Sequence, residues 1–198
     1  MYKQEVMLEA AAKAKQTMSH GDGGPFGAAI VHDGEVISVA SNTVLADHDP
    51  TAHAEVNAIR EACRKLGTHD LSGYELYATG SPCPMCLSAT IWSNIKTVYY
   101  SGTYKDAERV GFRDDHISKF IKGGSTDRDV VDLELRDNQI ACELYDAYQE
   151  QGGRFTRTPW HRGTSVSAGT VKGTKLACGE VNICGIQPIP HNAMSHRE

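Results

Sequence analysis

The sequence lacks an apolar run long enough to span a bilayer, which takes about 20 consecutive apolar residues. Its first segment, residues 1–5, mixes both charges and lacks the apolar stretch of a secretion signal. Six cysteines in such a chain are more typical of a reducing compartment than of a disulfide-stabilised scaffold. We therefore expect a cytoplasmic location and no membrane partner.

Positive charge is also scarce. The chain carries 20 lysines and arginines against 25 acidic residues, which gives a formal net charge of −5. Its basic residues do not form runs interleaved with aromatic residues, whereas proteins that bind a tRNA or DNA backbone usually present a basic face. We therefore expect a small-molecule substrate and no nucleic-acid partner.

The length of 198 residues suits one domain with an extension, and a hydrophobic content of 40% is enough for a full core. The pattern changes after Gly152-Gly153, because residues 156–198 are rich in Gly, Thr and Ser and lack helical periodicity. We predict one catalytic domain over residues 1–155 and a C-terminal extension of unknown role over residues 156–198.

Apolar periodicity and turn residues predict the order of helices and strands. Asp33-Gly34 is a strong hairpin signal, and Thr51 is expected to cap the helix that follows it. Such an order of helix, hairpin and alternating elements favours a three-layer α/β/α sandwich with a mixed five-stranded sheet. Helices are expected over residues 2–19, 52–66, 84–93, 106–110, 116–122 and 139–151, and strands over residues 26–31, 35–40, 74–78, 95–100 and 130–133.

Two short motifs carry the chemistry. His53-Ala54-Glu55 is followed about thirty residues later by Pro82-Cys83-Pro84-Met85-Cys86, the H-x-E and P-C-x-x-C signature of zinc-dependent nucleobase deaminases. Zinc prefers thiolate sulfur and imidazole nitrogen, so His53, Cys83 and Cys86 are the candidate ligands of one Zn²⁺. No fourth ligand follows at a comparable spacing, and a catalytic zinc site keeps one position open for water. Glu55 is then the candidate catalytic residue, because its carboxylate can move the proton of that water.

Each part of this pattern has an ordinary alternative. A single C-x-x-C is often a structural zinc site or a redox pair, a single histidine is more often a core residue, and H-x-E occurs by chance. A zinc-stabilised binding module without enzymatic activity would need a fourth protein ligand and would give Glu55 no role. The combination of both motifs with the two prolines favours the catalytic site.

Over residues 23–155 the chain resembles the bacterial guanine deaminases of the cytidine-deaminase-like superfamily. The resemblance rests on residues 23–28, Asn42, residues 49–56, residues 58–60, residues 82–86, Trp92, Gly111-Phe112 and Asp114. It implies that Asn42 hydrogen-bonds the purine, that Asp114 engages the edge bearing the amino group, and that Phe26 and Trp92 wall the ring. It also implies a homodimer, in which an aromatic residue of the tail, Phe155 or Trp160, closes the site.

The chemistry of guanine agrees with these roles. Guanine offers acceptors at O6 and N7 and donors at N1 and the 2-amino group, so an amide such as Asn42 can donate and a carboxylate such as Asp114 can accept. A tight turn over residues 23–25 would place Phe26 at the pocket mouth, and the backbone of Ala54 and Cys83 would help to orient the base. Without the resemblance, Asn42 would be interpreted as a turn former and Asp114 as a helix cap.

The two motifs predict a zinc-dependent hydrolase, and the resemblance implies that it converts guanine to xanthine and ammonia. A deaminase of guanosine, cytosine or another small aminated ring would keep the zinc chemistry and change only the pocket. A tRNA adenosine deaminase is a further alternative, against which the acidic charge balance argues.

Overall fold

The computed structural model describes residues 2–150, which form two compact units. The first unit comprises residues 2–119 and contains the sheet, and the second comprises residues 120–150 and contains the last helix. Each unit is considered by itself. The predicted domain boundary at residue 155 and the extension over residues 156–198 lie outside the described residues and stay predictions.

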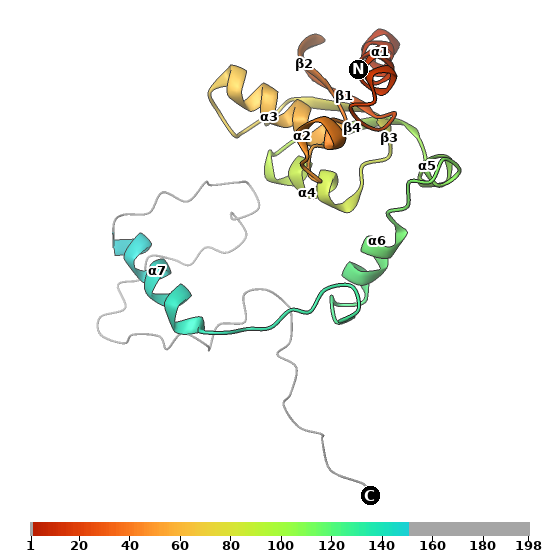
Figure 1. Ribbon diagram of the computed structural model, residues 1–198. Coiled ribbons are helices and arrows are strands. Elements are labelled where there is room, and N and C mark those ends of the chain that lie inside the picture. The colour runs from red at the N-terminus through yellow and green to blue at the C-terminus, as the bar shows by residue number, and fades with distance from the viewer. Residues whose placement is uncertain (1, 151–198) are drawn as a thin grey trace, which may run out of the picture. The chain divides into compact units, whose positions relative to one another are not determined.

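The first unit alternates helices and strands along the chain (Figure 1). Its helices are α1 (Gln4–His20), α2 (Val44–Asp47), α3 (Ala54–Leu66), α4 (Pro84–Trp92), α5 (Tyr104–Glu108) and most of α6 (Asp115–Lys122). Its strands are β1 (Gly27–His32), β2 (Glu35–Ser41), β3 (Glu75–Gly80) and β4 (Thr97–Gly102). The second unit contains the end of α6 and helix α7 (Asn138–Glu150).

The four strands form one mixed sheet in the order β2-β1-β3-β4. Strand β1 pairs antiparallel with β2 and with β3, while β3 and β4 are parallel. The β1–β2 hairpin turns at Asp33-Gly34, where φ is 48° and 82°, so the predicted hairpin is confirmed.

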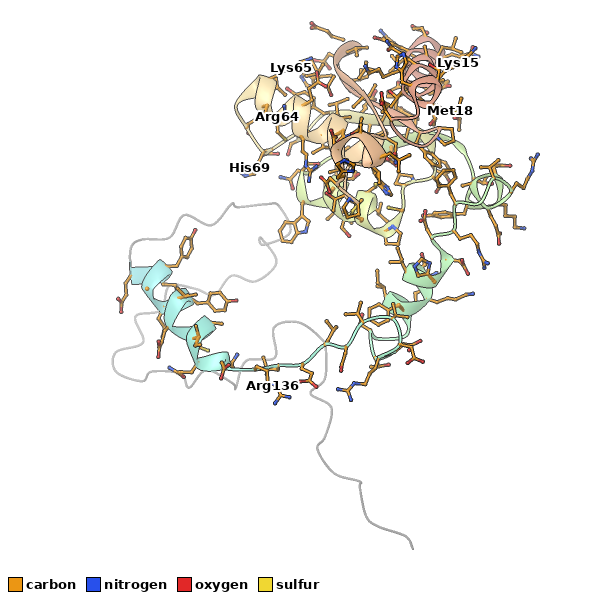
Figure 2. All side chains as sticks on the ribbon, viewed as in Figure 1. Lys15, Met18, Arg64, Lys65, His69 and Arg136 are labelled. Carbon is orange, nitrogen blue, oxygen red and sulfur yellow. The ribbon has the colours of Figure 1, made fainter. Side chains whose placement is uncertain are left out.

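The sheet separates two hydrophobic cores because successive strand residues point to opposite faces. On β1, Ala28 and Ile30 pack with α3, whereas Ala29 and Val31 pack with Val6 and Met7 of α1. Helix α1 therefore covers one face of the sheet and α3 covers the other, with α4 beside α3 (Figure 1). At the exposed C-terminal end of α3, Lys65, labelled in Figure 2, donates to the Ile37 carbonyl of β2 at 2.9 Å.

The prediction of a fifth strand over residues 130–133 is wrong, since the described residues form only four strands. The backbone there turns at Asp127, whose carbonyl accepts from Val130 and Val131 at 3.2 and 3.3 Å. The Asp127 carboxylate also accepts from the Asp129 backbone N–H at 3.1 Å. These local bonds compete with sheet pairing, as Asp side chains commonly do in turns.

The prediction that Thr51 caps the next helix is also wrong. Helix α3 begins after His53, which occupies the N-cap position. Thr51 instead donates its backbone N–H and its hydroxyl to Asp49 Oδ1, at 2.8 and 2.7 Å. The short helix α2 was not predicted, because four residues are too few to show an apolar period. Among the described helices, none is long and apolar enough to cross a membrane.

Candidate active site

Two helix N-termini bring the three predicted metal ligands together. His53 is the N-cap of α3 and Cys83 is the N-cap of α4, with Cys86 in the first turn of α4 behind Pro84. His53 Nδ1 lies 3.7 Å from Cys83 Sγ and 3.6 Å from Cys86 Sγ, and the two sulfurs are 3.5 Å apart. Within the described part of the chain, these three residues are the group that could hold a metal ion.

The geometry of this trio fits zinc. Ordinary Zn–S and Zn–N bond lengths in a tetrahedron place two sulfurs about 3.8 Å apart and a sulfur and a nitrogen about 3.6 Å apart. The distances in the chain match this spacing to within about 0.3 Å. Three protein ligands of soft sulfur and imidazole nitrogen are the donor set of a catalytic zinc site with one open position.

The three side chains of the trio are also close enough to hydrogen-bond to one another. The hydrogen bond between the two thiols lowers the pKa of Cys83 and raises the pKa of Cys86. The hydrogen bond to Cys83 raises the pKa of His53. Both cysteines lie at the N-terminus of α4, where the helix dipole favours the thiolates that zinc needs.

Glu55 lies in the first turn of α3, two residues after His53. Its side chain is only 7% exposed, yet it borders the pocket that the ligands face. Burial raises the pKa of this carboxyl above its usual range. A buried carboxyl of raised pKa beside a candidate metal site is typical of a residue that moves protons in catalysis.

A pocket of about 450 Å³ opens over the trio and is lined by residues of the first unit only. Its lining contains six of the nine predicted site residues: Phe26, Asn42, His53, Glu55, Cys83 and Asp114. Cys86 is fully buried behind the lining and completes the trio. The remaining lining residues are Gly23, Gly24, Pro25, Val44, Leu45, Ser81 and Phe112.

The amide of Asn42 has a fixed orientation. Its Oδ1 accepts from the backbone N–H groups of Gly24 and Val44, at 3.1 and 3.3 Å. With the oxygen engaged by the protein backbone, the Nδ2 group of this buried side chain remains as the donor to the pocket. The backbone of Gly23 also lies close to the backbone of Asn42. A Cβ at Gly23 would lie 2.0 Å from the Asn42 carbonyl oxygen, so only glycine fits there.

Asp114 lies on the loop that precedes α6 and borders the pocket. Partial burial raises the pKa of its carboxyl. Next to it in sequence, Arg113 forms ion pairs with Glu108 at 3.7 Å and with Asp115 at 3.5 Å. These pairs connect the end of α5 to the start of α6, on either side of Asp114.

Two predicted contacts do not appear in this lining. Trp92, at the C-terminal end of α4, is 64% exposed and does not border the pocket formed by the described residues. The Ala54 side chain is fully buried, and its predicted contact with the base would involve the backbone. The tail residues Phe155 and Trp160 lie outside the described residues.

Sequence reasoning missed several lining residues, of which Phe112 is the largest. Its ring meets that of Phe26 edge to face, with 4.8 Å between centroids. Gly24 lies beneath this pair, where a Cβ would be 3.1 Å from Phe112 Cζ. The Gly111-Phe112 dipeptide was part of the resemblance, but its place in the pocket depends on a tertiary contact. Val44 and Leu45 were missed because α2 was not predicted.

Comparison with known proteins agrees with this geometry. The family described as the cytidine and deoxycytidylate deaminase zinc-binding region matches residues 1–102. The guanine deaminase of Bacillus subtilis is 44% identical over 124 residues, which cover 63% of this chain and 80% of that protein. The tRNA-specific adenosine deaminase of Aquifex aeolicus is 47% identical over 105 residues, which cover 53% of this chain and 69% of that protein.

Solved structures give the same result. The crystal structure of the Bacillus subtilis guanine deaminase superimposes with a TM-score of 0.69 at 36% identity, covering 80% of this chain and 98% of that one. A guanine deaminase from Nitrosomonas europaea has a TM-score of 0.54 at 32% identity, covering 57% of this chain and 65% of that one. The chain therefore belongs to the cytidine and deoxycytidylate deaminase zinc-binding family.

Proposed function

We propose that this enzyme is a guanine deaminase, which hydrolyses guanine to xanthine and ammonia with one zinc ion per chain. The observation that carries this proposal is the pairing of one fixed donor, Asn42, with one acceptor, Asp114, in the pocket over the metal-ligand trio. Guanine presents acceptors at O6 and N7 and donors at N1 and the 2-amino group, so it complements both side chains. The similarity to two guanine deaminases supports the same substrate.

The residues divide the reaction among them. His53, Cys83 and Cys86 would hold the zinc, which when bound supplies the Lewis-acid chemistry that makes water nucleophilic near neutral pH. Glu55 takes one proton from the attacking water and delivers it to the ring nitrogen. It then moves the second proton of that water, from the new hydroxyl group on the ring carbon, to the amine, which leaves as ammonia. Burial of Glu55 supports this role because it raises the pKa of the carboxyl and so favours the protonated form that a proton carrier must reach.

The rest of the pocket positions the base. Asn42 donates through Nδ2 to an acceptor of the purine, and Asp114 accepts from the edge bearing the 2-amino group. Phe26 provides a flat wall for the ring, and the backbone of Ala54 at the start of α3 helps to orient it. We also retain Trp92 as a proposed wall of the complete site.

The assay that tests the substrate is ammonia release from a panel of compounds by the zinc-loaded protein. We expect guanine to have the highest kcat/KM, with guanosine, cytosine and adenine at least about 100-fold lower because they lack part of the donor and acceptor pattern or add a ribose. Equal or faster turnover of another member of the panel would replace guanine as the substrate.

A tRNA adenosine deaminase is the second candidate, and the similarity to the Aquifex aeolicus enzyme favours it. A net charge of −5 is unfavourable for binding a polyanion. Inosine formation in a tRNA anticodon substrate, measured beside the panel, distinguishes the two, and we expect none.

We further propose a homodimer in the cytoplasm. The dimer is supported by an exposed apolar face on α4, where Leu87, Ile91 and Trp92 are 47%, 44% and 64% exposed. The cytoplasmic location is supported by the trio, because Cys83 and Cys86 bind zinc only as reduced thiolates.

A further inference from the structure

Asn57, in the second turn of α3, contacts both halves of the site with one side chain. Its Nδ2 lies 3.0 Å from the Ser41 carbonyl oxygen, 2.9 Å from Thr43 Oγ1 and 3.3 Å from the Ala52 carbonyl oxygen. An amide nitrogen carries two N–H groups, so one of the three contacts is shared. The three acceptors belong to two segments that are separate in sequence.

Each of these segments carries one side chain of the site. Ser41 and Thr43 are the immediate neighbours of Asn42, and Ala52 immediately precedes His53. The two segments also meet directly, because the Thr43 backbone N–H donates to the Ala52 carbonyl at 3.0 Å. The Asn57 amide therefore lies where the Asn42 segment and the His53 segment join.

The backbone of Asn57 adds a second connection. Its N–H donates to the His53 carbonyl at 2.9 Å, which is the first hydrogen bond of α3. Asn57 thus holds the His53 residue by its main chain and the two flanking segments by its side chain. Its side chain is half-buried and does not border the pocket, so it has no contact with a bound base.

We infer that Asn57 is a positioning residue that fixes the base-binding amide of Asn42 relative to the zinc ligand His53. Two experiments test this inference: a metal arm, which measures zinc affinity, and a base arm, which measures KM for guanine. The base arm rests on the proposed function, whereas the metal arm does not. The reaction needs the base and the metal ligands in register, and a displacement of about 1 Å costs about 100-fold in rate in well-ordered sites. Residues that orient metal ligands change metal affinity by about 10- to 100-fold when they are replaced.

The metal arm compares Asn57→Leu with a matched control. Leu has the same branched shape and the same number of side-chain heavy atoms as Asn, and it makes none of the three hydrogen bonds. Ser38→Ala is the control, because Ser38 Oγ donates to the Ala58 carbonyl at 2.9 Å and also connects β2 to α3, away from the pocket. Zinc affinity is measured by competition with a chromophoric chelator. We expect about a tenfold loss of zinc affinity in Asn57→Leu and no change in Ser38→Ala.

The base arm is a double-mutant cycle on KM for guanine at saturating zinc, with Asn42→Asp as the second change. We expect Asn57→Leu alone to raise KM about tenfold, and to raise it less than about threefold when Asn42→Asp is already present. A merely structural role for Asn57 would raise KM by the same factor in both backgrounds.

The two arms also separate this inference from the proposed function. A parent protein that releases no ammonia from guanine refutes the proposed function, and the zinc competition then decides the role of Asn57 alone. An unchanged zinc affinity, or an additive cycle in a protein that deaminates guanine, overturns the inference. If Asn57→Leu does not fold, Asn57→Ser, which keeps one donor, replaces it in both arms and is held to the same outcomes.

Discussion

Glu55 is buried and also borders the pocket. Its proposed role in proton transfer is best tested by an isosteric substitution, which leaves the packing around it unchanged. Glu55→Gln keeps the size of the side chain but can no longer exchange a proton. We expect zinc content and folding to be retained and ammonia release to fall about 1,000-fold or more, within the range of general acid–base catalysis. Glu61→Gln, on the exposed side of the same helix, is the control and should keep the parent rate. A Glu55→Gln enzyme with the parent kcat would refute the mechanism.

Asn42→Asp isolates the donor of the pocket. The substitution keeps one oxygen for the Gly24 and Val44 backbone N–H groups, and it replaces the Nδ2 donor with a charged acceptor. The turn is therefore expected to fold, whereas the acceptor atom of the purine now faces a second acceptor, the carboxylate of the variant, in place of a donor. We expect kcat/KM for guanine to fall about 100-fold, because a site built to hydrogen-bond a group rejects the wrong partner strongly. Steady-state kinetics measure the loss of substrate recognition, and a thermal melt measures any loss of stability. A parent-like kcat/KM would show that Asn42 does not contact the base.

At the residue scale, the sequence predicted those side chains whose chemistry is local. His53, Cys83 and Cys86 were predictable because zinc ligation restricts residue type and spacing, and the structure places their ligand atoms together. Phe112 was not predictable, because its place in the pocket depends on an edge-to-face contact with Phe26, far away in the sequence. Contacts of that kind leave no period or motif in the chain.

The packing of α1 on the sheet depends on a glycine in β1. A Cβ at Gly27 would lie 2.0 Å from the Ala10 carbonyl oxygen and 3.2 Å from Ala14 Cβ, so α1 would have to move away. We expect Gly27→Ala to lower the free energy of unfolding by about 3 kcal/mol, at the upper end of the usual overpacking cost. Urea denaturation measures this value.

The comparison for that measurement is Gly67→Ala at the C-terminal end of α3. Gly67 has φ of 66°, and a Cβ added there would have nothing within 4 Å, so its substitution adds backbone strain without a clash. The expected cost is about 1 kcal/mol. Equal losses in the two variants would show that contact between α1 and β1 is not the cause.

The loop between α3 and β3 carries a pH-dependent contribution to stability. The Asp70 carboxylate accepts from the Ser72 hydroxyl and backbone N–H and from Asn94 Nδ2, and these bonds, led by the hydroxyl, lower its pKa. A lowered pKa in the folded state stabilises the protein above the ordinary Asp value, and this stability is lost as pH falls through the folded value. We expect Asp70→Ala to lower Tm by about 2 °C at pH 7, a small effect because solvent screens the exposed carboxylate.

The same comparison of Tm at low pH shows whether the stabilisation by Asp70 depends on its negative charge. Below the folded pKa of Asp70 both proteins carry an uncharged side chain there, so the difference in Tm should shrink as pH falls under about 4. A Tm difference that grows toward acid would mean that the carboxylate does not stabilise the loop.

At the element scale, periodicity predicted all the longer helices and the four strands of the sheet to within a few residues. It failed where polar side chains redirect the backbone, as Asp127 does before residues 130–133 and Asp49 does before Thr51. In both places an aspartate accepts from a backbone N–H two residues later. Apolar residues such as Val130 and Val131 carry strand propensity, yet the local turn prevails when no neighbouring strand of the described residues pairs with them.

At the scale of the whole molecule, the exposed side chains of α4 lead to a prediction about assembly. Ile91 and Trp92 follow Leu87 by four and five residues on one helix, and each of the three is more than 40% exposed. Apolar patches on soluble proteins usually mark contact surfaces, and a two-fold dimer lets one patch meet its own copy. We therefore expect a species of twice the chain mass in analytical ultracentrifugation.

A charge in that patch tests whether α4 forms the contact. Ile91→Glu places a carboxylate where two copies would meet, and burying an unpaired charge costs several kcal/mol, more than most dimers can absorb. We expect this variant to sediment as a single chain. Leu8→Glu, on the exposed side of α1 and equally apolar in the parent, should sediment like the unmodified protein. If Ile91→Glu stays at twice the chain mass while Leu8→Glu dissociates, the contact involves α1 rather than α4, and Trp92 loses its proposed connection to the assembly.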